Sequence, residues 1–332
     1  MSVDPAGEQA RAVRRGAGLF APSERALLEV VGGDRVRWLQ GQITNDVAKL
    51  AEGQGCYALL LTVKGRIVAD LHVLARGDRF WLETGSAARE AVRERLERYI
   101  VADDVALADA SERYARLALE GPAAARILSA AAGGAAPPPP EGACDLELAG
   151  RPAPVWAFGF TGLSAFQLLL APEAVPETRA ALLAAGRAHG LVEACADARE
   201  ILRVESGVPA LGSELHGEVF PAEARLERAV SFAKGCYTGQ EIVERIRSRG
   251  NVNYHLVGLR FAGEPPAPGS ELRADDGRRV GEVTSVARSP EAGAIGLGYL
   301  RRELETPGNE LRSAAGAARV APLPFVVEGG AG

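Results

Sequence analysis

Hydrophobic and polar positions in the N-terminal third of the chain follow the pattern of a small sheet covered by helices. Residues 56–62 are almost wholly apolar, which predicts a buried strand. After a turn at 63–65, apolar and polar residues alternate over 67–73, the period-two pattern of a strand with one buried face. Residues 87–99 then place apolar side chains at helical intervals between charged ones. The sequence therefore predicts a β-hairpin with an amphipathic surface helix packed on it.

The middle of the chain predicts further strands and helices on either side of a long loop. Residues 130–142 include four consecutive prolines and lack periodicity, which predicts an exposed loop. Apolar segments at 155–158 and 165–170 predict strands that are able to return to the domain before the loop. Two helices are predicted over 176–190 and 197–206, each ended by a glycine.

The C-terminal part of the chain has a different pattern of apolar residues and turns. From residue 254 onward, short apolar runs are separated by turns rich in Pro and Gly, which predicts a small antiparallel β-barrel. A chain of 332 residues is too long for one core and is expected to form two or three domains, because one domain takes ~150 residues. We therefore expect an α+β protein with a separate C-terminal barrel.

Composition indicates where the protein is located and which kinds of partner it is not expected to bind. The 38 Lys and Arg residues against 43 Asp and Glu residues give a net charge of -5, which argues against direct nucleic-acid binding. The four cysteines contain no C-x-x-C pair, so neither a disulfide framework nor a metal site is indicated. The N-terminus lacks the apolar segment of a secretory signal, and no stretch approaches the ~20 apolar residues of a membrane span. We expect a cytoplasmic protein without a membrane partner.

The segment Lys-Gly-Cys-Tyr-Thr-Gly-Gln-Glu at 234–241 carries the strongest chemical signal. Thr238 and Glu241 have the spacing of a capping box, so a helix is expected to begin at Thr238. Cys236 would then feel the positive end of the helix dipole, worth about 0.3–1 kcal/mol per charge, and Lys234 would add a cation. Both effects favour a reactive thiolate, while the alternative is a small buried hydrophobe. The other cysteines are interpreted as structural.

Two carboxylates are candidates for binding or acid–base chemistry. Glu205 falls on the apolar face of its predicted helix near the C-terminus, where the dipole disfavours negative charge. Such a carboxylate needs N–H donors, which a heterocycle with a ring N–H and an adjacent amino group would supply; otherwise Glu205 points to solvent from a frayed end. Asp70 and His72 share the polar face of one strand, where they either line a cleft and move protons or form an exposed face.

The helix predicted after the cysteine motif carries a row of basic residues. Arg245, Arg247 and Arg249 extend along it toward its C-terminal end. They either hold an anionic tail or solvate the helix end.

Together these segments resemble the YgfZ family, whose hallmark is the stretch from Lys234 to Glu241, unchanged here. The resemblance extends to 38–47, to 64–74 and to the segment around Glu205, and it spans nearly the whole chain. The family is similar to the glycine-cleavage aminomethyltransferase, which implies three domains around a central channel that holds tetrahydrofolate. We place an N-terminal α+β part at 1–110, a second α+β region at 111–250 and the barrel at 251–328.

The resemblance also assigns roles to residues of the cofactor site. It maps the glutamate that anchors the pterin onto Glu205 and makes Cys236 the working thiol. We further predict that Lys234, Tyr237 and Arg245 contact the cofactor.

One departure concerns the paired aspartates of the transferase hairpin. The first is replaced here by Ala69, and only Asp70 remains as a weaker catalytic candidate. This incomplete pair counts against aminomethyl transfer and leaves open whether the protein turns over as an enzyme.

The function implied by the resemblance is that of a folate-binding accessory protein for assembly or repair of iron–sulfur clusters in client enzymes. One alternative is an aminomethyltransferase-type one-carbon enzyme, which would need Asp70 as its acid–base residue and a lipoyl-protein partner. Another is a folate-dependent accessory factor for tRNA modification, in which Cys236 would be dispensable.

Overall fold

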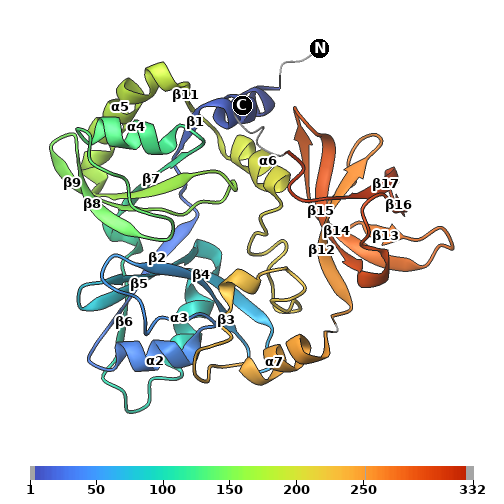
Figure 1. Cartoon of the computed structure of the whole chain (residues 1–332), viewed down its shortest axis with the longest axis horizontal. Helices are drawn as coiled ribbons and strands as arrows, with labels where there is room; N and C mark the ends of the chain where they lie inside the picture. The colour runs from blue at the N-terminus through green and yellow to red at the C-terminus, as the bar shows by residue number, and fades with distance from the viewer. Residues whose placement is uncertain (1–3, 251, 327–332) are drawn as a thin grey trace.

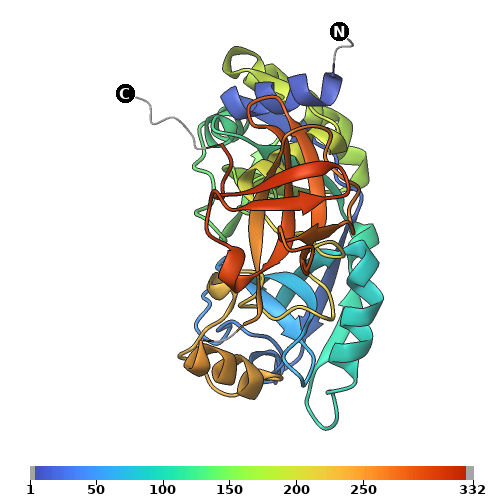
Figure 2. The same ribbon diagram turned by 90° about the vertical axis from the view of Figure 1, so that its right-hand side faces the viewer.

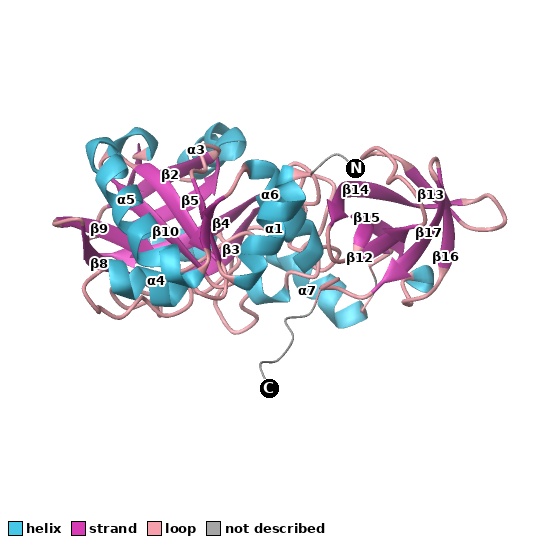
Figure 3. Cartoon of the chain, turned by 90° about the horizontal axis from the view of Figure 1, so that it is seen from above, coloured by secondary structure: helices cyan, strands magenta, loops and turns pink. Residues whose placement is uncertain are grey.

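Three lobes make up the computed structural model of the chain, which describes residues 4–250 and 252–326 (Figure 1). Two lobes are built on β-sheets and the third is a barrel. Seen from above, helices α1 (Pro5–Arg15) and α6 (Ala196–Ser206) lie between the sheet lobes and the barrel (Figure 3). The fold is thus an α+β arrangement of three units, as the sequence predicts.

The first sheet has the strand order β3-β4-β5-β2-β6, and each adjacent pair is antiparallel. Its strands are β2 (Arg25–Val31), β3 (Gly55–Leu61), β4 (Ile67–Arg76), β5 (Arg79–Gly85) and β6 (Ala106–Asp109). Helices α2 (Arg35–Gln42) and α3 (Arg89–Glu97) cover one face and bury Trp38, Leu39, Val92 and Leu96 against it. The predicted hairpin and surface helix are both present.

The second sheet has the order β11-β1-β7-β10-β9-β8 and is antiparallel except for the pair β1 and β11. Its strands are β1 (Ala17–Phe20), β7 (Ala115–Glu120), β8 (Ala143–Leu148), β9 (Arg151–Trp156), β10 (Ala165–Leu170) and β11 (Leu191–Glu193). Helices α4 (Ala124–Ala131) and α5 (Val175–Gly186) pack on it. The proline loop lies between α4 and β8, and the strands after it rejoin the same sheet, as predicted.

The C-terminal lobe is a closed six-stranded barrel with the order β12-β15-β14-β13-β16-β17. Its strands are β12 (Tyr254–Phe261), β13 (Glu271–Arg273), β14 (Arg279–Ser289), β15 (Gly293–Arg301), β16 (Glu310–Ser313) and β17 (Gly316–Ala321). In the side view the barrel faces the reader, with helix α7 (Gln240–Arg249) below it (Figure 2). The predicted barrel is confirmed.

Single-turn 3₁₀ helices complete the described structure. They lie at Ser86–Ala88, Ser111–Arg113, Pro172–Ala174, Arg187–His189, Glu227–Ala229 and Arg302–Leu304.

The N-terminus is placed differently from the prediction. Strand β1 pairs with β7 and β11 of the second sheet, so residues 5–20 lie in that lobe and outside the sheet that forms most of the predicted unit 1–110. Apolar side chains of α1, α6 and the barrel share one core, which includes Val13, Leu202 and Leu297. This long-range packing holds the N-terminal segment away from its sequence neighbours.

Helix α7 begins later than the capping-box spacing predicts. Its first residue is Gln240, and its N-cap is Gly239 with a left-handed backbone (φ 86°) and no side-chain cap bond. A Cβ atom at Gly239 would lie 2.6 Å from the carbonyl oxygen of Thr62. The close approach of this turn to the β3–β4 turn therefore requires glycine and displaces the helix start from Thr238.

The helix predicted over 197–206 is present as α6. Helix α6 begins at Ala196, with Cys195 at its N-cap position and no side-chain cap bond from that residue. Its C-terminal end is as predicted, because Gly207 adopts the left-handed conformation (φ 70°).

Candidate functional site

A cleft of about 850 Å³ lies where the two sheet lobes face α6 and the segment that follows it. A second cavity of about 550 Å³, between that segment and the barrel, shares Gly212 and His216 with the cleft. The charged side chains of the cleft wall are Glu24, Arg25, Asp70, Asp197, Arg199, Glu200 and Arg203. The cleft is therefore large enough for an organic ligand and carries both signs of charge.

Asp70 is the distinctive group on this wall. Its residue is 6% exposed, and its Oδ2 atom accepts a hydrogen bond from the Tyr57 hydroxyl at 3.2 Å. Its Oδ1 atom is buried and has no hydrogen-bond partner among the described residues. A buried carboxylate oxygen without a donor is costly, so this atom is suited to receive an N–H or O–H group from a ligand in the cleft.

Strand β4 explains why Asp70 reaches the cleft and Ala69 does not. Successive side chains of a strand point to opposite faces. Ala69 is fully buried in the core beneath α2 and α3, together with Leu71. A carboxylate at position 69 would therefore point away from the cleft, and the missing first aspartate leaves the cleft wall intact.

The arginines of the cleft wall are already paired within the protein. Arg25 donates two hydrogen bonds to Glu83, both at 2.5 Å. Arg199 pairs with Glu24 at 2.5 Å, and Arg203 pairs with Glu200 at 2.6 Å and with Glu214. Their charge is thus largely balanced, which leaves the Asp70 carboxylate as the buried cleft charge with the fewest donors.

Phe160 forms an apolar surface beside these arginines. The guanidinium carbons of Arg25 and Arg199 lie 4.4 Å and 4.7 Å from the centre of its ring. Sequence reasoning did not identify Arg25, Arg199 or Phe160, because each lies in an ordinary stretch and only the fold brings them together.

The alternative of an exposed strand face for Asp70 and His72 is wrong. His72 is 4% exposed, its ring stacks on Phe158 at 3.9 Å, and its Nδ1 atom lies 3.3 Å from a carboxylate oxygen of Glu141. The second sheet lobe covers this face of β4. Both faces of the strand are therefore buried, whereas the period-two pattern predicted one buried face.

Glu205 lies outside the residues that line the cleft. Its carboxylate is 1% exposed and pairs with Arg14 of α1 and with the Ser289 hydroxyl of the barrel. The argument that this carboxylate lacks donors is therefore wrong, because Arg14 and Ser289 supply them. Its contact with a pterin stays a prediction that this geometry does not favour.

We expect Glu205→Gln to lower the free energy of unfolding by about 1–3 kcal/mol, because Arg14 loses a charged, buried partner. Urea unfolding measures the loss, and a titration with tetrahydrofolate is expected to show unchanged affinity. Normal stability with lost affinity would instead restore the pterin role.

The other predicted cofactor contacts also lie away from the cleft wall. Lys234 is buried and donates to the carbonyl oxygens of Gln40, Ile43 and Asn45 at 2.6–2.8 Å. Burial lowers the pKa of Lys234 to about 8. Its ammonium group is thus engaged by a backbone turn, and the predicted role of a cation beside the thiol is not what this geometry shows.

Tyr237 and Arg245 complete that set. Tyr237 is 6% exposed, within an apolar cluster that joins the first sheet to α7, and burial raises the pKa of its hydroxyl to about 12. Arg245 projects from an exposed position on α7, where it pairs with Glu241. Neither side chain belongs to the cleft wall.

The four cysteines differ in accessibility: Cys236 and Cys195 are exposed, whereas Cys56 and Cys144 are half-buried. Burial raises the pKa of Cys56 to about 12. We expect iodoacetamide to label Cys236 and Cys195 first and Cys56 last, since the thiolate is the reactive form. Peptide mass spectrometry at several times gives the order, with the urea-unfolded protein as the control in which all four react alike. Equal labelling of Cys56 and Cys236 in the folded protein would contradict the assignment.

These features define a class of protein: three lobes, the last of them a C-terminal barrel, with a large cleft beside the sheet lobes. The GCVT N-terminal domain matches residues 2–234, and the glycine cleavage T-protein C-terminal barrel domain matches residues 255–326. The chain therefore belongs to the glycine-cleavage T-protein family. Tetrahydrofolate, which the resemblance implied for this chain, is the cofactor of this family.

Individual relatives agree with this assignment. The chain is 36% identical over 331 residues to an aminomethyltransferase of Rubrobacter xylanophilus, covering 98% of this chain and 88% of the relative. It is 34% identical to an aminomethyltransferase of Thermus thermophilus, covering 96% and 90%. The crystal structure of glycine cleavage system aminomethyltransferase T from Bartonella henselae superposes with a TM-score of 0.87 at 25% identity, covering 97% and 89%.

The relatives support the predicted aminomethyltransferase alternative better than the iron–sulfur function. They confirm the family and the fold, while the YgfZ subfamily stays a prediction. Within residues 4–250 and 252–326, no helix is both long and apolar enough to cross a membrane.

Proposed function

We propose that this chain binds tetrahydrofolate in the central cleft and uses Asp70 in one-carbon transfer of the aminomethyltransferase type. The observation that carries the proposal is that Asp70 belongs to the cleft wall and that its buried Oδ1 atom has no hydrogen-bond donor among the described residues. A pterin presents ring N–H and amino groups, which are the donors that such an atom lacks.

Asp70 is placed for both orientation and proton transfer. The Tyr57 hydroxyl holds Oδ2, so the carboxylate is fixed while Oδ1 stays available to the ligand. Burial raises the pKa of Tyr57 well above its usual value, and the nearby Asp70 carboxylate adds to this, so the hydroxyl remains a donor. Asp70 would orient the N–H edge of the ligand and accept or return the proton exchanged at the reacting nitrogen.

The incomplete aspartate pair does not argue against this function, because of where Ala69 lies. Because side chain 69 points into the core, its identity does not change the groups that a ligand meets. The relatives named aminomethyltransferase add independent support.

Calorimetric titration with tetrahydrofolate tests the proposed cleft. Ala87→Trp places a large ring at an exposed position of the cleft wall and is expected to weaken binding by about tenfold or more. Ala135→Trp, at an exposed position in the proline loop, is the matched control. Equal affinities for the two variants would show that the ligand does not occupy this cleft.

A second candidate function is maintenance of iron–sulfur clusters in client enzymes, with Cys236 as the working thiol. Cys236 is exposed on a loop that Lys234 anchors, outside the cleft wall, which supports a role toward another macromolecule more than toward the cleft ligand. Iron–sulfur enzyme activity in cells that carry Cys236→Ala or Asp70→Asn separates the two. Loss only with Cys236→Ala favours this candidate, and normal activity with Cys236→Ala removes it.

A further inference from the structure

Tyr57 connects Asp70 to a cluster of rings at the junction of the two sheet lobes. Its hydroxyl donates to Oδ2 of Asp70 at 3.2 Å, and both residues are buried. Tyr57 lies directly opposite His72 in the pairing of β3 with β4, and the centres of the two rings are 4.9 Å apart. Asp70 and His72 are two residues apart on β4, so their side chains leave the same face of the strand. The His72 ring therefore packs on the side chain that binds Asp70.

The second sheet lobe restrains the His72 ring. The ring stacks on Phe158, with 3.9 Å between the ring centres and 22° between the planes. Trp156 and Phe160 pack against it in T-shaped arrangements, with ring centres at 6.4 Å and 5.9 Å. Aromatic pairs at these separations favour defined relative orientations. The three contacting rings come from β9 and the segment that follows it, so one lobe fixes a ring that belongs to the other.

Glu141 adds a polar contact to the same ring. One of its carboxylate oxygens lies 3.3 Å from Nδ1 of His72. Within the described structure, Glu141 is one of three non-glycine residues with a positive φ (59°), a conformation that is costly for most residues. Its N–H donates to the Ala157 carbonyl at 2.8 Å, and its own carbonyl accepts from Nε1 of Trp156 at 3.2 Å. These bonds hold a strained backbone that places a carboxylate beside a buried imidazole.

We infer that His72 is a positioning residue for Asp70 and acts through Tyr57. Its ring, which Glu141 and the second sheet lobe orient, holds the Tyr57 hydroxyl on the Asp70 carboxylate. A displacement of a reacting group by about 1 Å can lower a rate by about 10²-fold, so this packing is expected to affect transfer. The consequence for the rate rests on the proposed function of Asp70, whereas the placement of Tyr57 is measured without it.

The test labels the tyrosines of the full-length protein with carbon-13 at the ζ carbon. The Tyr57 resonance is identified by its absence from Tyr57→Phe, and its chemical shift reports the hydrogen bond of the hydroxyl. Asp70→Asn removes the charge of the acceptor and provides the reference for a weakened bond. The measurement needs neither folate nor an aminomethyl donor.

We expect His72→Ala to move the Tyr57 resonance toward its position in Asp70→Asn. His72→Phe is expected to leave it near its position in the parent protein, because phenylalanine keeps a ring stacked on Phe158. Glu141→Ala should cause a smaller shift in the same direction as His72→Ala. If His72→Ala does not fold, His72→Leu takes its place, since leucine retains bulk without a flat ring.

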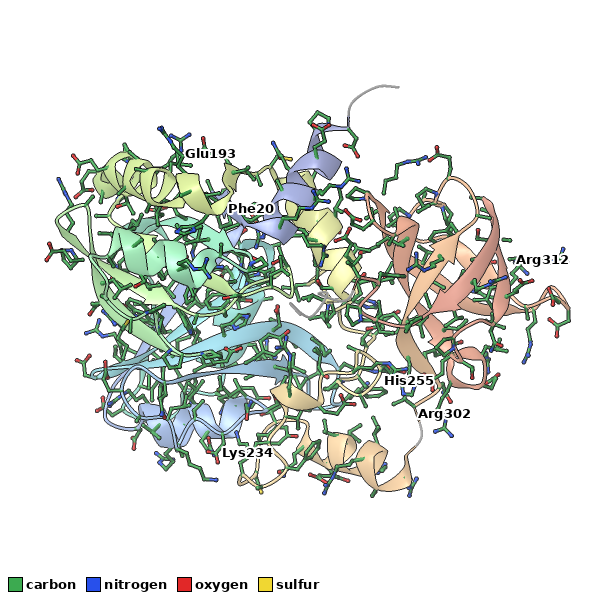
Figure 4. All side chains as sticks on the ribbon, turned by 45° about the horizontal axis from the view of Figure 1, so that its top comes forward. Phe20, Glu193, Lys234, His255, Arg302 and Arg312 are labelled. Atoms are coloured by element: carbon green, nitrogen blue, oxygen red, sulfur yellow. The ribbon has the colours of Figure 1, made fainter. Side chains whose placement is uncertain are left out.

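Two controls separate this effect from a general loss of packing. Tyr114→Ala removes a ring that packs on Trp81 at 5.5 Å, in a core cluster that both sheet lobes share. It should lower stability without moving the Tyr57 resonance. Arg312→Ala, on the barrel and far from the sheet lobes, gives the size of an unspecific change (Figure 4).

The transfer reaction supplies a second readout. His72→Ala is expected to lower kcat about tenfold while the affinity for tetrahydrofolate changes less than about threefold, because His72 is not a cleft-wall residue. In a Tyr57→Phe background the same substitution should have little further effect on kcat, because both changes act on one hydroxyl group. A purely structural role would give equal losses in the two backgrounds.

An unmoved Tyr57 resonance in His72→Ala, or equal shifts in His72→Ala and His72→Phe, would overturn the inference. Losses of kcat that multiply in the double variant would also contradict it. A normal transfer rate for Asp70→Asn would refute the proposed function alone, and the Tyr57 resonance would still decide whether His72 positions Asp70. Failure of one proposal is therefore distinguishable from failure of the other.

Discussion

Asp70→Asn is expected to reduce aminomethyl transfer to tetrahydrofolate by about 10²–10⁴-fold, the usual contribution of a positioned acid–base group. The amide has nearly the same shape as the carboxylate but cannot take up a proton at neutral pH. Because Tyr57 can still donate to the amide oxygen, the fold and the cleft are expected to persist. Single-turnover formation of methylenetetrahydrofolate from an aminomethyl donor measures the effect, and circular dichroism checks the fold.

The matched control is Asp197→Asn, which removes an exposed carboxylate from the same cleft wall. We expect its rate to stay within about threefold of the parent, since exposed charges contribute at most about 1 kcal/mol. A normal rate for Asp70→Asn would refute the proposed chemistry. A parent protein that binds tetrahydrofolate but transfers no carbon would leave the cleft as a binding site only.

Glu83→Ala is expected to lower the free energy of unfolding by about 3–5 kcal/mol, the range for breaking a buried ion pair. Glu83 is fully buried between Arg25 and Arg116, whose side chains are 9% and 6% exposed. Burial opposes ionisation, but the two arginines hold the pKa of Glu83 below its usual value. Without this carboxylate, two guanidinium groups beneath the cleft would be left without their shared partner.

Urea unfolding followed by tryptophan fluorescence measures this loss. Glu97→Ala on α3 is the control, because Glu97 pairs with Arg93 at an exposed position and should contribute less than about 1 kcal/mol. Replacing the whole cluster by Glu83→Leu, Arg25→Met and Arg116→Met is expected to recover much of the stability. Similar losses for Glu83→Ala and Glu97→Ala would contradict the assigned burial of this pair.

Local sequence patterns were sufficient for much of the fold. The alternation over 67–73 identified β4, because a strand that packs on helices must place apolar groups on every second residue. Gly207 identified the end of α6, because few other residues adopt its left-handed backbone readily. Evenly spaced turns identified the barrel, and the hallmark at 234–241 led to a related family.

The candidate site required the tertiary structure. Glu205 is neutralised by Arg14, which lies 191 residues earlier, and Lys234 is bound by carbonyl oxygens of a turn about as distant in sequence. The local sequence around Glu205 and around Lys234 does not indicate these distant partners.

By itself, the sequence determined which segments become strands and helices and which residue types carry chemistry, because backbone conformation and amphipathic periodicity depend on near neighbours. The tertiary structure alone decided that β1 joins the second sheet, that Asp70 faces a cleft while Ala69 faces the core, and that Cys236 lies on the outside. The physical reason is that burial, ion pairing and exposure are set by contacts between segments far apart in the chain.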